Sequence, residues 1–181
     1  MMKAPELTKL ALKGVRVLEV GEGPAVAYAG KIFADFGAEV LKVEPLQGDP
    51  WRRMPPLVQP LEGAEPESAL FAWMNTNKRS ITADLSKQQE RAWIGQLART
   101  CDVVLDARAL TEGVDVLARA LASEGESAEA THAPIEVDLT WFGESGPYRD
   151  YMGSEAVCRA MSGAVHGSGP IEGPPHMPHD V

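Results

Sequence analysis

The segment WFGESGPYRDYMGSEAV combines a glycine-rich turn with one carboxylate at the start of an expected helix. Gly143 allows the backbone to approach a ligand closely, because glycine has no side chain. Glu155 falls in the first helical turn, where the helix dipole favours a carboxylate and where Ser154 can cap the helix. The residues alone leave two interpretations open: an acidic side chain that stabilises the helix start, or a carboxylate that does chemistry.

A second polar segment, NTNKRS, places two amides and two cations within six residues. Lys78 and Arg79 suit phosphate oxygens, and Asn75 can orient polar groups of a ligand. The alternative is a solvated loop of the same composition, which the residue types by themselves favour.

The turn GEGPA follows an expected strand and opens an expected helix, as a phosphate-binding turn does in α/β folds. Gly21 and Gly23 lack the third glycine of a nicotinamide-dinucleotide fingerprint, because Val26 stands near its place. A tight turn without a ligand explains the same residues.

The composition indicates a soluble protein without a disulfide framework or a metal site. The net charge of −9 over 181 residues argues against nucleic acid and anionic membranes as partners. No apolar run has the ~20 residues of a membrane span, and no signal-peptide core is found at the N-terminus. Two cysteines, Cys101 and Cys158, are expected to be packing residues in a reducing, cytoplasmic location. The pair His176 and His179 lies among prolines, which forbid a metal-binding helix.

Apolar runs and helical periods alternate along the chain, which predicts an α/β fold: an open, mostly parallel, Rossmann-like sheet with flanking helices. Ligands in such folds bind at the carboxyl ends of the strands. Tyr28, Ala29, Ile32 and Phe36 recur at helical spacing, which is typical of an apolar helix face. Asp84 and Ser86 are candidate caps for a later helix. The expected strands are 14–20, 38–45, 78–85, 102–107 and 135–141, the expected helices are 25–36, 67–75, 87–100, 111–123 and 154–162, and residues 45–66 are expected to be a long loop.

Several ordered blocks resemble the class III CoA-transferase family (CaiB/BaiF type), which includes formyl-CoA and carnitine CoA-transferases and 2-methylacyl-CoA racemases. The resemblance covers about residues 10–175 and implies the N-terminal part of a Rossmann-like large domain. It divides the chain into a CoA-transferase-like domain at 10–165 and a Gly/Pro-rich tail or truncated linker at 166–181. The blocks are GVRVLEV, YAGKIFADFGAEVLKVEP, GDPWR, NTNKRSITADL, DVVLDA, WFGESGPYRD and EAVCRAMSG.

The resemblance implies an enzyme that moves CoA between an acyl-CoA and a carboxylic acid through intermediates on an aspartate carboxylate. Gly153, Ser154 and Glu155 stand where the family commonly has Gly-Tyr-Asp, so Glu155 takes the place of the nucleophile. CoA is then a substrate, and no permanently bound cofactor is expected. The racemase branch uses a His-Asp pair, and Ser154 replaces that histidine.

The resemblance also implies where acyl-CoA binds. Two positions depart from the family: Ala107-Arg108 replaces its usual Asn-Phe, and Ala25-Val26-Ala27 replaces its Ala-Gly-Pro, with the proline displaced to Pro24. The expected CoA contacts are Pro24, Ala25, Asn75, Lys78, Arg79, Asp84, Ala107, Arg108 and Gly143.

Family members are much longer chains that form interlocked homodimers. The resemblance therefore implies either such a dimer at full length or a complementing C-terminal chain. The alternative functions are a catalytically degenerate module that serves assembly or partner binding, and a racemase-like isomerase.

Overall fold

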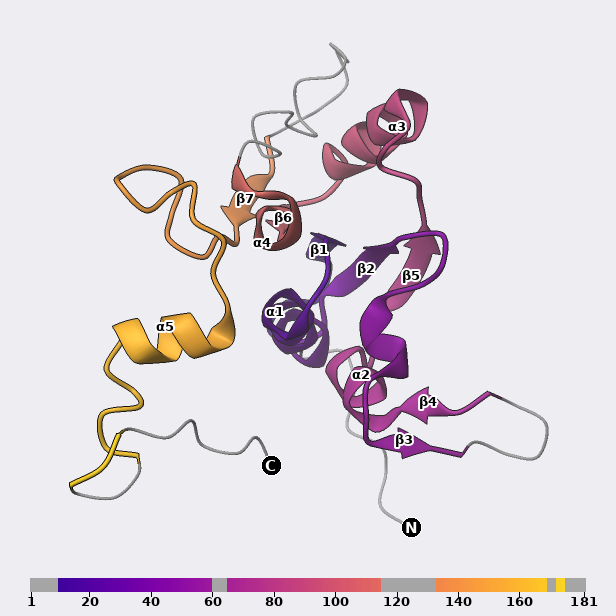
Figure 1. The fold of residues 1–181 in the computed structure, drawn as a ribbon. Coiled ribbons are helices and arrows are strands. Elements are labelled where there is room, and N and C mark those ends of the chain that lie inside the picture. Colours follow the sequence, from indigo (N-terminus) through magenta and orange to yellow (C-terminus); the bar gives the residue numbers. More distant parts are fainter. Residues whose placement is uncertain (1–9, 60–64, 115–132, 169–171, 175–181) are drawn as a thin grey trace.

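A computed structural model describes residues 10–59, 65–114, 133–168 and 172–174, and confirms the α/β fold. One sheet holds five parallel strands in the order β5-β2-β1-β6-β7 (Figure 1). Its strands are β1 (Arg16–Val20), β2 (Glu39–Glu44), β5 (Arg79–Thr82), β6 (Val103–Asp106) and β7 (Ile135–Asp138). The helices are α1 (Pro24–Asp35), α2 (Ala69–Met74), α3 (Gln88–Ala98), α4 (Ala109–Glu112) and α5 (Glu155–Met161).

Two expectations change in the connecting segments. The stretch 45–66 contains a 3-10 helix, η2 (Pro50–Arg53), and β3 (Leu57–Val58), which pairs antiparallel with β4 (Glu67–Ser68). The described residues do not show the helix expected at 111–123: α4 starts at Ala109 and ends at Glu112, with Gly113 as its C-cap at φ +84°. The part of the expected helix beyond residue 114 lies outside the described residues.

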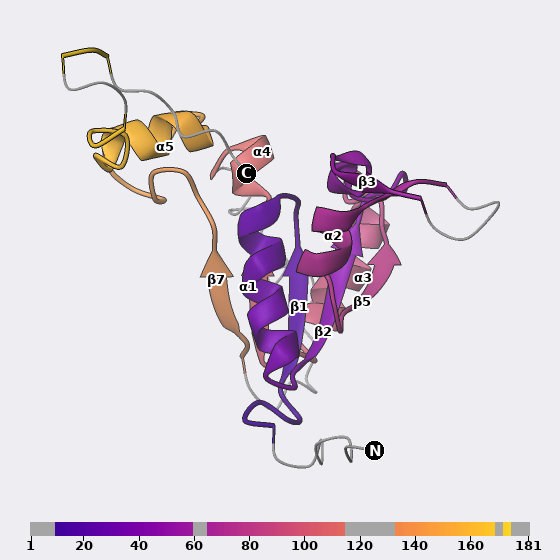
Figure 2. The ribbon, with the colours of Figure 1, turned by 90° about the horizontal axis from the view of Figure 1, so that it is seen from below.

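Strand β1 lies at the centre of the sheet. Val17 pairs with Val40 of β2 on one side and with Val103 of β6 on the other. All residues of β1 after Arg16 are buried, which fits a parallel strand covered on both faces. Helix α1 covers one face and α3 the other, as Figures 1 and 2 show, so the core has two layers of apolar side chains.

The expected apolar face of α1 is wrong for its three large residues, whereas Ala29 is half-buried and packs against the core. Tyr28, Ile32 and Phe36 are 44–55% exposed. The helix instead buries small residues against the sheet, among them Gly30 and Ala34. Small side chains let the helix axis approach the strands closely, which turns the large side chains outward.

The segment after β6 is less covered. All four residues of β7 are exposed, and α5 buries none of its residues. Figure 1 shows α5 standing away from the sheet, joined to β7 by the glycine-rich segment. No helix of the described residues is long and apolar enough to cross a membrane.

Candidate active site

A cavity of about 830 Å³ lies at the carboxyl edge of the sheet, where the sequence placed the ligand. Its walls come from the β1–α1 turn, η2, α2, α4, the segment after β7 and the start of α5. The lining residues are Glu22, Gly23, Pro24, Ala25, Tyr28, Trp51, Met74, Leu110, Thr111, Asp138, Leu139, Thr140, Trp141, Glu155 and Cys158.

The β1–α1 turn forms one wall of this cavity. Gly21 has φ +96°, and a side-chain carbon there would lie 2.8 Å from the carbonyl carbon of Ala107. The ends of β1 and β6 therefore touch through backbone atoms, and Ala107 is fully buried. Pro24 and Ala25 follow at the start of α1, exposed and in the lining, whereas Ala107 supports the wall from behind.

Trp141 forms the opposite wall. Its indole N–H donates to the carbonyl of Leu110 at 2.9 Å. A side-chain carbon on Gly153 would lie 2.6 Å from Cγ of Trp141, so the backbone before α5 packs directly on the indole ring. Trp141 thereby connects α4 to the segment that carries Glu155.

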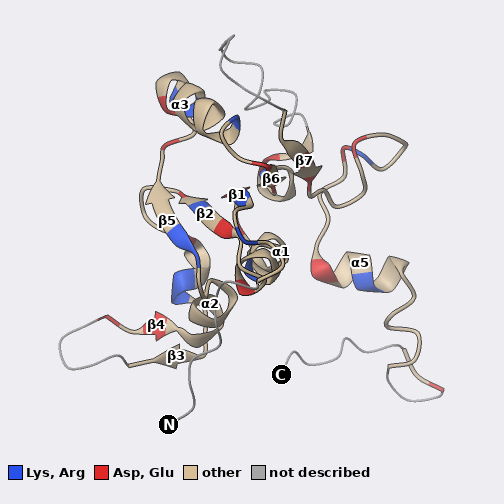
Figure 3. Ribbon diagram, turned by 180° about the vertical axis from the view of Figure 1, so that it is seen from behind, with Lys and Arg blue, Asp and Glu red and all other residues tan. Residues whose placement is uncertain are grey.

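Glu155 is the first residue of α5, and its carboxylate is 59% exposed at the cavity. Ser154 caps the helix as expected, because its hydroxyl accepts from the backbone N–H of Val157 at 3.3 Å. The guanidinium of Arg159 pairs with the carboxylate one turn later. In Figure 3 these charges mark the red start and the blue middle of α5. Glu155 therefore lies both in the first turn of a capped helix and at the cavity, so the position fits either role: stabilising the helix start or doing chemistry.

Two further carboxylates line the cavity, and sequence reasoning missed them. Burial raises the pKa of Glu22, and the charge of Asp49 raises it further. Partial burial likewise raises the pKa of Asp138, with the Asp106 carboxylate as the next cause. Asp138 could have been found from the sequence, because it lies near the carboxyl end of an expected strand, where ligands bind in such folds. Cys158, expected to be a packing residue, also lies in the lining, one helical turn after Glu155.

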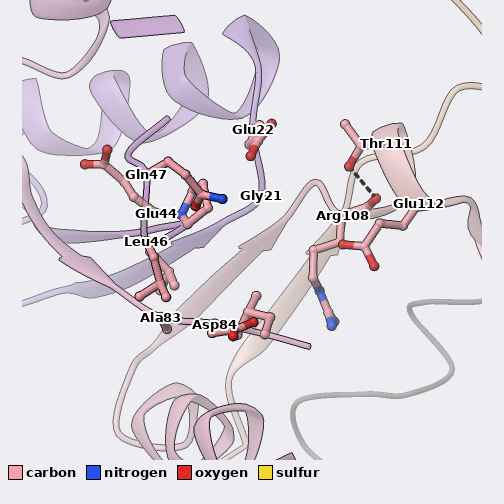
Figure 4. A pocket seen from close by; sticks show the side chains of 13 residues that line it. Gly21, Glu22, Glu44, Leu46, Gln47, Ala83, Asp84, Arg108, Thr111 and Glu112 are labelled. Atoms are coloured by element: carbon pink, nitrogen blue, oxygen red, sulfur yellow. Dashed lines mark hydrogen bonds between the residues drawn. The ribbon is translucent and has the colours of Figure 1, made fainter. Parts of the chain in front are cut away.

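Asp84 and Arg108 line an adjoining, smaller cavity of about 250 Å³, which shares Glu22 and Thr111 with the large one (Figure 4). The Arg108 guanidinium is buried and binds the Asp106 carboxylate through contacts of 2.6–3.0 Å. Asp84 does not cap α3: its carboxylate accepts from the backbone and hydroxyl of Ser86. The N-cap residue of α3 is Lys87, and its side chain makes no capping hydrogen bond.

Lys78 and Asn75 line a hollow of about 170 Å³, and the Lys78 side chain turns inward from it. The Lys78 ammonium group donates to Glu19 at 2.7 Å, to the carbonyl of Ala27 at 2.6 Å and to Asn75 Oδ1 at 2.9 Å. Its side chain is 2% exposed, and burial lowers its pKa. In this structure Lys78 is a buried ion-pair partner rather than an exposed cation, because Glu19 draws it inward. Arg79 is exposed and lines the same hollow.

Lys42 extends the buried Lys78–Glu19 ion pair toward the large cavity. Its ammonium group contacts Glu19 and Asp49, each at 2.9 Å. Burial lowers the pKa of Lys42, but the two carboxylates outweigh this and leave it raised. The other oxygen of Asp49 accepts from the backbone N–H of Trp51 at 2.9 Å. The network therefore holds η2, and with it the Trp51 wall, in place.

Gly143 lies outside the cavity lining. It is exposed with φ +85°, and its N–H donates to the Thr140 hydroxyl at 2.8 Å. The structure thus brings Pro24, Ala25 and Glu155 together. It brings Asn75, Lys78 and Arg79 together at the hollow of about 170 Å³, and Asp84 and Arg108 at the cavity of about 250 Å³. Ala107 is buried and Gly143 lies on the surface.

The fold and the cavity define a class: an open parallel α/β domain with a carboxylate-lined ligand cavity at its carboxyl edge. Residues 12–180 match CoA-transferase family III, and the chain belongs to this family.

Relatives and solved structures agree with this assignment. The chain is 35% identical over 173 residues to a succinate–glutarate CoA-transferase of Agrobacterium fabrum, covering 92% of this chain and 41% of the relative. It is 33% identical to succinyl-CoA:glutarate CoA-transferase of Mus musculus, covering 92% and 36%. A CaiB/BaiF family protein from Brucella suis superposes with a TM-score of 0.78 at 30% identity, covering 94% and 44%. The chain thus spans about two fifths of the length of these relatives.

Proposed function

We propose that the chain takes part in CoA transfer between an acyl-CoA and a carboxylic acid, with Glu155 as the acyl-accepting carboxylate. The observation that carries the proposal is the place of Glu155, exposed at the mouth of the large cavity. An exposed carboxylate can meet a thioester without breaking contacts of the core. Acyl-CoA is then a substrate, and the chemistry needs no resident cofactor.

The proposed cycle begins when the Glu155 carboxylate attacks the thioester carbonyl carbon. The C–S bond breaks, CoA leaves as a thiolate, and the acyl group stays on Glu155 as a mixed anhydride. The thiolate attacks the Glu155 carbonyl and releases the donor acid, leaving CoA on Glu155 as a thioester. The acceptor carboxylate attacks this thioester, the C–S bond breaks, and a second mixed anhydride forms between Glu155 and the acceptor. The released CoA thiolate then attacks the acceptor carbonyl carbon of this anhydride and forms the new acyl-CoA. The last step restores the Glu155 carboxylate, so the cycle balances without an added acid or oxidant.

Glutamate is longer than the aspartate that the family resemblance places here, by one C–C bond of about 1.5 Å. Misplacement on this scale can cost about 10²-fold in rate when the side chain is held rigidly. Glu155 is not enclosed, since more than half of its side chain faces solvent. Its additional rotatable bond therefore leaves the carboxylate free to adjust its position at the cavity.

Trapping tests the role of Glu155. The protein is incubated with an acyl-CoA and hydroxylamine, which converts an activated glutamate into a hydroxamate, and the peptide 141–162 is analysed by mass spectrometry. We expect the hydroxamate on Glu155, and none in Glu155→Gln. Asp150→Asn is the matched control, because Asp150 is an exposed carboxylate of the same segment. A folded protein that binds CoA and yields no adduct contradicts the proposal.

A second candidate is a non-catalytic module that keeps the fold for assembly. Apolar side chains on α1 and on β7 favour it, since Phe36 and Ile135 are 55% and 67% exposed. The same exposure supports the proposal that a further segment, a second copy or a complementing chain completes the domain. Calorimetry with CoA separates the candidates: micromolar binding supports the transferase, and absence of binding supports the module.

A further inference from the structure

The large cavity combines an apolar aromatic wall with a carboxylate-rich rim. We propose that it takes an apolar, uncharged acyl group, of the kind a monocarboxylic acid supplies, and discriminates against an acyl group with a second carboxylate. This inference rests on the proposed function, because it names the acyl class handled at the same site.

The wall is built from large apolar side chains. Trp51 and Trp141 face the cavity from η2 and from the segment after β7, and the further apolar members are Tyr28, Met74, Leu110 and Leu139. A volume of about 830 Å³ is within the roughly 300–1,000 Å³ of small-molecule pockets, so the cavity has room for an acyl chain. Transfer of methylene groups from water to such a wall is favourable, whereas transfer of a carboxylate is costly unless it is paired.

The rim carries three carboxylates, those of Glu22, Asp138 and Glu155. The raised pKa values of Glu22 and Asp138 show that their surroundings already disfavour negative charge. A second carboxylate on the acyl group would add another negative charge next to them.

Two arginines near this edge are paired with carboxylates. Arg159 pairs with Glu155, and the Arg108 guanidinium is buried against Asp106. The described residues of the lining include no lysine, arginine or histidine. The relatives named above are described as acting on succinate and glutarate, which are dicarboxylic acids. The acyl class proposed here therefore differs from the one in those names.

Calorimetry with hexanoyl-CoA, succinyl-CoA and free CoA tests the inference. We expect hexanoyl-CoA to bind at least about tenfold more tightly than succinyl-CoA, the size of effect that one repulsive charge contact can produce. We also expect succinyl-CoA to bind no more tightly than free CoA. Equal or tighter binding of succinyl-CoA overturns the inference and leaves the proposed function standing.

A charge-neutralising variant tests the cause. Asp138→Asn removes one rim charge, and we expect it to reduce the preference for hexanoyl-CoA over succinyl-CoA several-fold. Glu136→Gln is the matched control: Glu136 lies two residues earlier in β7 and outside the cavity lining, so its variant keeps the preference. An unchanged preference in Asp138→Asn overturns the electrostatic argument.

Free acids keep the test independent of CoA. If no CoA compound binds, the proposed function fails, and the acyl class is read from tryptophan fluorescence with hexanoate and adipate. Trp51 and Trp141 line the cavity, so an occupant changes their emission. A shift with hexanoate that adipate does not produce supports the inference. An equal response to both acids, or no response to hexanoate, overturns it.

Discussion

The β1–α1–β2 unit and the segment from β7 to α5 use carboxylates in opposite ways. Glu19 of β1 is fully buried and holds two lysines, Lys42 and Lys78. Glu155 of α5 is mostly exposed and pairs with one arginine of its own helix. The comparison teaches that burial, rather than residue type, separates the carboxylates that stabilise this fold from those available for chemistry.

The largest effect is expected from removing Lys42, the lysine that Glu19 and Asp49 share in the buried network. Lys42→Met leaves Glu19 and Asp49 without their common cation. We expect a loss of about 3–5 kcal/mol in the free energy of unfolding, measured by urea denaturation. Lys87→Met, at an exposed ion pair beside the start of α3, is the control and should cost far less than Lys42→Met. Equal losses in the two variants would contradict the assigned role of burial.

The role of the exposed carboxylate can be tested by displacing Glu155 without mutating it. In Gly153→Ala the new methyl group meets the Trp141 ring and displaces the start of α5. We expect hydroxamate formation at Glu155 to fall by about 10²-fold, with a small change in the urea midpoint because α5 buries no residue. Gly167→Ala is the control, since a side-chain carbon there meets no atom within 4 Å. Unchanged trapping in Gly153→Ala would show that the indole does not position Glu155.

The pH dependence of stability extends the comparison to a third carboxylate, Glu44. Burial raises the pKa of Glu44, but hydrogen bonds from Arg52 and from the Asp49 backbone outweigh it and lower the pKa to about 2. The folded pKa is below the unfolded value of 4.5, so this stabilisation is present above pH 4.5 and is lost as the pH falls toward 2.

Urea midpoints measured across this pH range should therefore fall, and Arg52→Gln should flatten the decline. The neighbouring Arg53 is exposed, and Arg53→Gln should keep the slope of the unaltered protein. The same slope in both variants would show that Arg52 is not the cause.

The smallest effect is expected at the Glu155–Arg159 pair. It joins exposed side chains one helical turn apart, an arrangement worth about 0.3–0.5 kcal/mol. Arg159→Met should therefore change the free energy of unfolding by less than about 0.5 kcal/mol. A loss above about 2 kcal/mol would place this pair with the buried network of Glu19 instead.

The sequence predicted the sheet because apolar strands alternate with helical segments, and it placed Pro24, Ala25 and Glu155 at the correct edge. It did not reveal that the Lys78 ammonium group is buried, because its ion-pair partner, Glu19, is 59 residues away in the chain. It missed Trp51 as a cavity wall for a different reason. The position of that ring depends on contacts between β2 and η2, which no local pattern encodes.

Asp49 divides its two carboxylate oxygens between separate tasks: one pairs with Lys42 in the interior, and the other fixes the backbone of Trp51. Any change that widens the aromatic wall by moving η2 must also disturb the interior charge balance. Mutations that change the width of the cavity are therefore expected to change the stability of the fold as well. In a lineage of such proteins, variants with an altered acyl preference would emerge first among those with stability to spare.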